Sequence, residues 1–78
     1  MKDFESFQKA FGQKVKEIRM SKGRTQEWMD DKQEYGVDIK HYQNIEQGRA
    51  NITLKTIYKI CKKLGVKPSE IFEVNNKH

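Results

Sequence analysis

Residues 25–48 read TQEWMDDKQEYGVDIKHYQNIEQG and have the pattern of two short helices. Thr25 stands where the first would begin, and its hydroxyl can accept a bond from an unpaired N–H of the first helical turn. Asp38 can cap the second helix in the same way, and its charge suits the positive end of the helix dipole. Gly36, between them, offers the backbone freedom of a sharp turn. The stretch therefore predicts two helices joined by a glycine-containing turn.

Each helix of this pair should bury one side of its surface. We expect Trp28 and Met29 to be buried on the first helix. On the second, which spans about Ile39–Gln47, we expect Tyr42 and Ile45 to point inward because they are three residues apart. The outward face of the second helix is then polar and carries Lys40, His41, Gln43 and Asn44.

The residues before the pair predict one long helix, from about Asp3 to Lys22. Its apolar side chains recur every three or four residues and so form one stripe, made of Phe4, Phe7, Phe11, Val15 and Ile18. We expect the last three of these side chains to pack in the core. Phe4 and Phe7 extend beyond what a small domain needs, which makes them candidates for a dimer contact.

The residues after the pair predict two further helices. Thr53 is the expected N-cap of a helix whose apolar face repeats at helical spacing, with Ile57, Ile60, Cys61 and Leu64. Gly65 suits the position just past its end, and Pro68 suits the first position of a short last helix, PSEIF. No segment alternates convincingly like a strand. We therefore expect an all-α fold, a compact five-helix bundle.

The length of 78 residues leaves room for one domain with a modest core, so we expect a single domain over residues 1–78. The net charge of +5 favours an anionic partner, although many small domains carry such a charge for solubility alone. One cysteine excludes an intrachain disulfide. The sequence shows no signal peptide and no membrane-spanning run, so the expected location is the reducing cytoplasm.

Two long segments resemble a known family. FGQKVKEIRMSKGRTQEWM (11–29) and GVDIKHYQNIEQGRANITLKTIYKICKKLGVKPSEIF (36–72) look like the phage-repressor and Cro-type (XRE-like) helix-turn-helix domains. The more specific parts, in their order and spacing, are TQE at 25–27, IEQG at 45–48 and LGV at 64–66. The resemblance implies a DNA-binding transcriptional regulator with the lambda-repressor-like fold. It divides the chain into a helical N-terminal extension, a family core and a frayed tail, at residues 1–10, 11–72 and 73–78.

The resemblance places the second helix of the pair in the major groove of double-stranded DNA. Four of its residues match positions that face base edges: Ile39, Lys40, His41 and Asn44. The chemistry agrees, because lysine can donate to guanine, asparagine can bond adenine bidentately, and isoleucine can touch a thymine methyl. His41 is also consistent with a solvated surface histidine, since no second metal ligand accompanies it at helical spacing.

Five other residues match positions that contact the DNA backbone in the family: Thr25, Gln26, Gln43, Arg49 and Asn51. Gln26 lies at a helix start, where backbone N–H groups also favour a phosphate; the alternative is a glutamine that only caps the helix. Arg49 and Asn51 lie in a loop that runs along the DNA in such domains. The resemblance also implies a structural ion pair between Arg19 and Glu46, which joins the long first helix to the end of the third.

The chain departs from the family pattern between the two central helices. Asp30 stands where a small residue is usual, and the spacing from Gln26 to Gly36 is longer than in the family by about two residues. A longer first helix of the pair or a wider turn would absorb this extra length. The departure leaves open the angle between the two helices.

The distribution of charge allows two interpretations. Residues 25–47 hold two cations against six acids, a balance of −4, whereas residues 1–24 carry +4 and residues 48–78 carry +5. In the first interpretation the acids point away from DNA, and Arg24, Arg49 and Lys55 supply phosphate contacts. In the second, the domain has weak or no DNA binding and serves as a protein-interaction module, such as an antitoxin or an adaptor.

One domain of this kind reads only a few base pairs, so the resemblance implies a homodimer on two half-sites. The candidate dimer surface involves Ile71, Phe72 and Val74, and the alternative for the first two is closure of the monomer core. An enzyme is not expected, because the sequence lacks a nucleophile–base pair, a phosphate-cradling glycine loop and a metal-ligand cluster. For the same reason no cofactor, metal or small-molecule substrate is expected.

Overall fold

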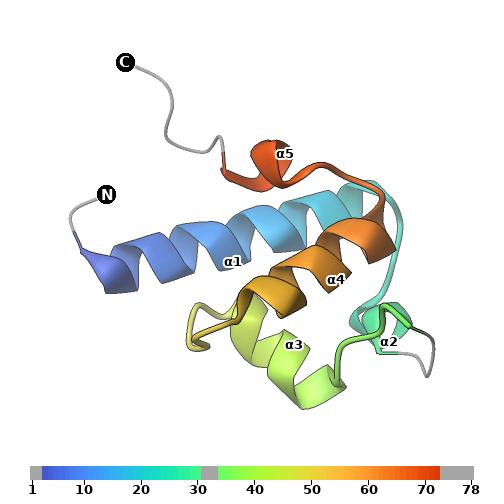
Figure 1. The fold of residues 1–78 in the computed structure, drawn as a ribbon, viewed down its shortest axis with the longest axis horizontal. Helices are drawn as coiled ribbons and strands as arrows, with labels where there is room; N and C mark the ends of the chain where they lie inside the picture. The colour runs from blue at the N-terminus through green and yellow to red at the C-terminus, as the bar shows by residue number, and fades with distance from the viewer. Residues whose placement is uncertain (1–2, 31–33, 73–78) are drawn as a thin grey trace.

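The part of the chain that the structure describes folds into five helices (Figure 1). The structure is a computed structural model and describes residues 3–30 and 34–72. The helices are α1 (Phe4–Ser21), α2 (Gln26–Met29), α3 (Ile39–Glu46), α4 (Leu54–Leu64) and α5 (Pro68–Phe72). The expected all-α, five-helix fold is confirmed. The residues expected to form a frayed tail, 73–78, lie outside the described residues.

The long helix α1 packs against two of the other helices. It contacts α3 and α5, while α2 packs on α3 and α5 packs on α4. In Figure 1, α1 crosses the view with α3 and α4 below it and α5 above it. The outer side of α3 is therefore turned away from α1.

Side-chain caps at three helix starts are the ones expected from the sequence. Asp3 accepts a bond from the backbone N–H of Ser6 at 2.8 Å, and Thr25 accepts one from Trp28 at 3.1 Å. Thr53 accepts the bond from Thr56 at 3.2 Å. These bonds satisfy donors that have no partner within the helix, which fixes where each helix begins.

The core gathers buried apolar side chains from every helix and from the connection between α2 and α3. Among the described residues it comprises Phe11, Val15, Met29, Val37, Tyr42, Ile45, Ile60, Cys61, Leu64 and Ile71. Trp28, Ile18 and Ile57 were expected inside but are only partly buried and pack against its edge. Ile71 is fully buried and closes the monomer core, whereas Phe72 remains 40% exposed.

The connection between α2 and α3 differs from the expectation at its glycine. Positive φ angles among the described residues occur at Gly23, Gly48 and Gly65, so the turn does not use the left-handed freedom of Gly36. Helix α2 has only four residues, so the extra length lies in the connection to α3 rather than in a longer helix. Val37 N donates to the Met29 carbonyl at 2.8 Å and closes this connection, of which residues 31–33 lie outside the described part.

Candidate nucleic-acid interface

Helix α3 begins at two carboxylates. Asp38 Oδ2 accepts bonds from the backbone N–H groups of Lys40 and His41 at 3.2 and 3.3 Å, and Asp30 Oδ2 accepts one from Ile39 at 3.1 Å. These first N–H groups of the helix have no intrahelical partner, and the carboxylates supply one. Asp30, the residue that departs from the family pattern, thus ties the end of α2 to the start of α3.

The outer face of α3 carries the four residues expected to face bases. Lys40 and Asn44 are exposed, while Ile39 and His41 are partly buried. Because positions three and four apart share a helix face, Lys40, His41 and Asn44 project from the side opposite the core. This face offers an ammonium group, an imidazole and an amide. It is chemically suited to the donors and acceptors of a DNA groove.

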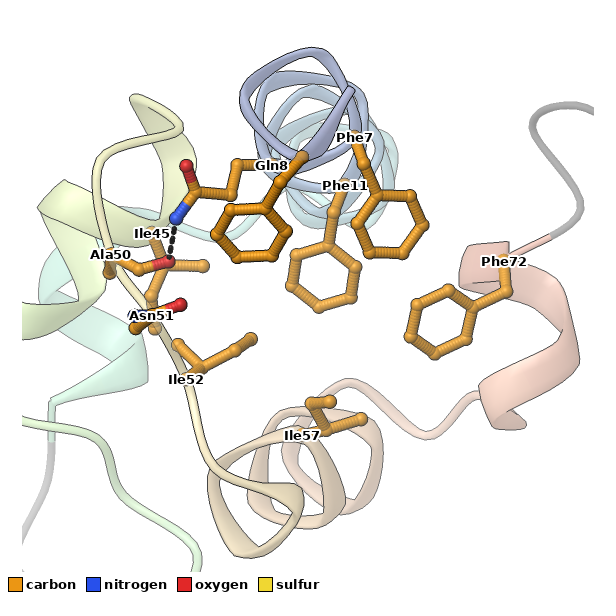
Figure 2. Close-up of a pocket in the computed structure, with 10 residues that line it drawn as sticks. Phe7, Gln8, Phe11, Ile45, Ala50, Asn51, Ile52, Ile57 and Phe72 are labelled. Carbon is orange, nitrogen blue, oxygen red and sulfur yellow. Dashed lines mark hydrogen bonds between the residues drawn. The ribbon is translucent and has the colours of Figure 1, made fainter. Parts of the chain in front are cut away.

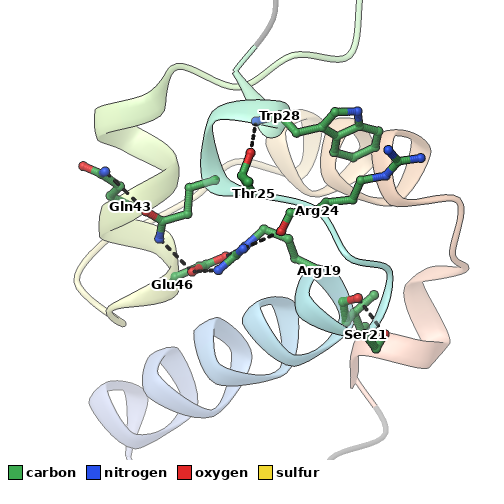
Figure 3. Close-up of polar contacts among 9 residues, drawn as sticks. Arg19, Ser21, Arg24, Thr25, Trp28, Gln43 and Glu46 are labelled. Atoms are coloured by element: carbon green, nitrogen blue, oxygen red, sulfur yellow. Dashed lines mark hydrogen bonds and ion pairs between the residues drawn. The ribbon is translucent and has the colours of Figure 1, made fainter.

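A chain of polar contacts joins α1, α2 and α3 behind this face (Figure 3). Arg19 Nε lies 2.7 Å from Glu46 Oε2, and a second guanidinium nitrogen donates to Glu46 Oε1 at 3.2 Å. Gln26 donates to the same Oε1 at 2.9 Å, and Gln43 donates to the Gln26 amide oxygen at 3.4 Å. Arg19 and Glu46, expected to pair, are therefore in bidentate contact, and Gln26 and Gln43 extend that contact outward.

The network keeps Glu46 ionised inside the fold. Burial alone would raise the pKa of Glu46, but its interactions with Arg19, Tyr42 and Gln26 outweigh burial and lower it. The same contact raises the pKa of Arg19. The side chains of the pair are only 10% and 3% exposed, so loss of either partner would leave a buried charge without its counterion.

Tyr42 lies beside the ion pair with its hydroxyl buried. That hydroxyl makes no hydrogen bond within the described residues. Burial, and after it the neighbouring Glu46, raises the pKa of Tyr42, so the phenol stays neutral. Tyr42 thus packs beside the ion pair as a neutral phenol.

Gln26 and Gln43, expected to contact the DNA backbone, already have partners inside the protein. Both side chains are partly buried, and one N–H of the Gln26 amide is used by Glu46. An amide carries two N–H groups, so Gln26 retains a second donor. Thr25 is exposed, and its hydroxyl oxygen caps α2. Phosphate contacts by these three residues stay predictions.

The loop after α3 is hydrogen-bonded to the last turn of the helix. Gly48 adopts a left-handed φ of 75°, and Arg49 N donates to the Asn44 carbonyl at 2.9 Å. The side chains of Arg49 and Asn51 are exposed, as is Lys55 in the first turn of α4. Arg49 and Asn51, the two residues expected to contact the DNA backbone, therefore lie in the loop directly after α3.

Arg24, the third cation considered for a phosphate contact, has a different environment. Its guanidinium carbon lies 4.4 Å from the centre of the Trp28 ring, and Lys63 Nζ lies 4.3 Å from the same centre. The negative face of an aromatic ring attracts cations at such distances. In Figure 3, Arg24 and Trp28 stand on the opposite side of the view from Gln43. Arg24 is thus directed toward α4 rather than along α3.

Several acids of the central stretch are committed to contacts within the fold. Asp30 and Asp38 accept backbone N–H groups of α3, and Glu46 is paired with Arg19. The backbone N–H groups carry a partial positive charge and the Arg19 guanidinium a full one, so each contact partly neutralises a carboxylate. The acidic balance of residues 25–47 therefore overstates the repulsion that a phosphate would meet at α3.

Two features near this surface were not expected from the sequence. Gln8 Nε2 donates to the Ala50 carbonyl at 2.9 Å across a separation of 42 positions, which no local pattern can signal. Leu54 and Tyr58 are 82% and 54% exposed and border an apolar hollow between α4 and α5. A signal was present for Tyr58, which lies off the stripe of Ile60 and Leu64, but not for Leu54, which stands seven residues before Cys61 and continues the stripe.

Residues 3–30 and 34–72, which the structure describes, have neither a membrane-spanning helix nor a metal-binding cluster. None of their helices has the length and apolarity to cross a membrane. They contain no group of three or more histidine, cysteine, aspartate or glutamate side chains placed to hold a metal ion.

Helices α2 and α3, with the polar outer face on the second of the two, have the arrangement of helix-turn-helix DNA-binding domains. The sequence profile of the family described as Helix-turn-helix matches residues 15–71. The chain belongs to this helix-turn-helix family. It is a DNA-binding transcriptional regulator, as the resemblance in its sequence implied.

Two known proteins are similar to the chain over most of its length. The control protein C.BamHI of Bacillus amyloliquefaciens is 37% identical over 65 residues, which cover 81% of this chain and 76% of that protein. The crystal structure of the restriction-modification controller protein C.AhdI from Aeromonas hydrophila matches with a TM-score of 0.76 and 30% identity. That match covers 86% of this chain and 98% of C.AhdI.

Proposed function

We propose that this chain controls a restriction–modification system as a homodimer that binds a two-fold symmetric DNA operator. The similarity to a control protein and to a restriction-modification controller supports the biological setting. The outer face of α3 supports the mode of binding, with one α3 of each protomer in the major groove.

The main observation is that candidate phosphate contacts flank α3 on both sides and are bonded to it. On one side Gln26 is linked to Gln43 by the 3.4 Å bond, at the start of α2. On the other side Arg49 is linked to Asn44 through its backbone N–H. Phosphate contacts on two sides of a recognition helix fix its register in the groove, while the helix itself reads bases. Such bonding keeps both flanks in a constant position relative to α3.

Sequence reading is assigned to Ile39, Lys40, His41 and Asn44. Lys40 and Asn44 are exposed and can donate to guanine and bond adenine, and each good bidentate contact gives about 1–3 kcal/mol of discrimination. Ile39 is partly buried, so only its outer part is available to a thymine methyl. His41 shares this face, and the role assigned to it is contact with the DNA.

An apolar face on α4 and α5 supports the homodimer. Leu54, Tyr58 and Phe72 are exposed there, beside a hollow lined also by Ile57, Cys61, Val66 and Pro68. Exposed apolar surface of this kind is typical of association sites, and a two-fold dimer would use the same face of both protomers. The sequence suggested a dimer surface made of Ile71, Phe72 and Val74. Ile71 is buried in the monomer and Val74 lies outside the described residues, so Phe72 is the residue of that set that lies on this apolar face.

The salt dependence of binding to a short duplex of mixed sequence tests the proposal. We expect affinity to fall steeply with salt, because each neutralised phosphate releases a counterion. Arg49→Ala should reduce the slope of log K against log[salt] by about 0.9. Lys16→Ala, which changes an exposed lysine of α1, is the matched control and should leave the slope unchanged. No binding at low salt would refute the proposal and favour the protein-interaction module.

A further inference from the structure

We infer that Gln8 is a positioning residue for DNA-backbone contact, because its side-chain amide fixes the loop that carries Arg49 and Asn51. The inference rests on the proposed DNA-binding function. It assigns a role to the first half of α1, which precedes the residues 15–71 that the family profile matches.

The contact joins α1 to the middle of the loop. Gln8 Nε2 donates to the Ala50 carbonyl at 2.9 Å, and Figure 2 shows the amide reaching from α1 to the loop. Ala50 stands between Arg49 and Asn51, whose side chains are both exposed. One bond therefore holds the peptide between the two residues that are expected to meet phosphates.

Two neighbouring contacts of α1 hold the start of the same loop. A Cβ atom added at Gly48 would lie 2.8 Å from Lys9 Cα, and one added at Gly12 would collide with the carbonyl oxygen of Ile45. The backbones of α1 and the end of α3 thus approach each other closely because these positions are glycines. Gln8 continues this row of contacts one step further along the loop.

The surroundings of the Gln8 amide favour a persistent bond. Gln8 borders a cavity of about 140 Å³ whose lining includes all four phenylalanines of the chain, Phe4, Phe7, Phe11 and Phe72 (Figure 2). The bond is partly buried, and in apolar surroundings water competes less for the carbonyl. Because most of the lining is apolar, methionine, which is close to glutamine in length, suits the same position.

The first test removes the donor and keeps the shape, by means of Gln8→Met. We expect the affinity for a short mixed-sequence duplex to fall about 2- to 10-fold, the range for loss of one hydrogen bond that orders a contact. Gln13→Met is the matched control, since Gln13 is an exposed glutamine of α1 whose side chain donates to Glu17 in the same helix at 3.3 Å. Gln13→Met should leave the affinity unchanged. Melting temperatures of both variants, measured in parallel, show that the fold is intact.

A double-mutant cycle separates positioning from a general structural role. If Gln8 acts through the loop, Gln8→Met should have little effect on DNA affinity once Arg49→Ala and Asn51→Ala are present. A loss of the same size in both backgrounds would overturn the inference, as would unchanged affinity of Gln8→Met. Both results presuppose binding by the wild-type chain. Absence of salt-dependent binding by the wild type would instead refute the proposed function, and this inference with it.

Discussion

Glu46 is the residue on which the relative placement of α1, α2 and α3 depends most. Its carboxylate receives Arg19 from α1 and Gln26 from α2 while it closes α3. We expect Glu46→Ala to lower the free energy of unfolding by about 3–5 kcal/mol, because it leaves the buried Arg19 guanidinium unpaired. Denaturant unfolding measures this loss, with Glu27→Ala, an exposed acid of α2, as the control. A loss no larger than that of the control would contradict a buried pair.

The lowered pKa of Glu46 also predicts a pH dependence of stability. A carboxyl whose pKa is lower in the folded state stabilises the fold above its ordinary pKa, here 4.5, and this stabilisation is lost as pH falls through the folded value. The free energy of unfolding of the wild type should therefore exceed that of Glu46→Gln by a constant amount above pH 4.5, and the difference should shrink in acid. A difference that does not change with acidification would show that the carboxylate is not stabilised by folding.

At the scale of the element, the start of α3 depends on Asp30. Asp30→Ala should lower stability by about 0.5–2 kcal/mol, the usual cost of a lost helix cap. The backbone amide of Ile39 should exchange its hydrogen faster, because it loses its partner. Thermal unfolding and hydrogen exchange measure the two effects, and Glu34→Ala removes an exposed acid from the same connection as a control.

The same pair of variants distinguishes a cap from an acid that merely repels DNA. If Asp30 only added negative charge near the phosphates, Asp30→Ala would bind duplex DNA more tightly than the wild type. If Asp30 holds α3 in place, the variant gains nothing in affinity and loses stability. Tighter binding with unchanged stability would therefore argue against the cap.

The elements themselves were largely predictable from the sequence, because the signals that define them are local. Thr25, Asp38 and Thr53 mark helix starts by their own hydroxyl or carboxylate, and the glycine at position 65 marks the end of α4. The composition of the outer face of α3 also followed from helical period. The use of Asp30, by contrast, depends on a contact nine positions away, which no local pattern signals.

The contacts that join elements could not be predicted in this way. The bond from Gln8 to Ala50 and the one from Gln26 to Glu46 depend on how α1, α2 and α3 pack, and no pattern within a helix specifies it. The partial burial of Trp28 has the same origin, since the cations that cover its ring come from the segment before α2 and from α4. The resemblance to the family supplied the Arg19–Glu46 contact only because the family already contains that packing.

At the scale of the whole molecule, the apolar face of α4 and α5 predicts that DNA binding depends on self-association. Leu54→Gln should weaken the dimer and the affinity for an operator without lowering stability of the monomer, because Leu54 is 82% exposed. Met20→Gln makes the same change at an exposed apolar residue of α1, 59% exposed, and should leave both properties unchanged. Sedimentation at increasing protein concentration measures the dimer. Equal self-association of the two variants would place the interface elsewhere.

The central claim is that α3 reads a DNA sequence from a symmetric dimer. Selection of bound duplexes from a random DNA pool at low salt tests it most directly, because it requires no knowledge of the operator. We expect enrichment of a two-fold symmetric sequence whose half-sites lie about one helical turn apart, or a multiple of that distance. Lys40→Ala and Asn44→Ala should relax the selected sequence at particular positions of each half-site. Recovery of an unenriched pool by the wild-type chain would contradict the account.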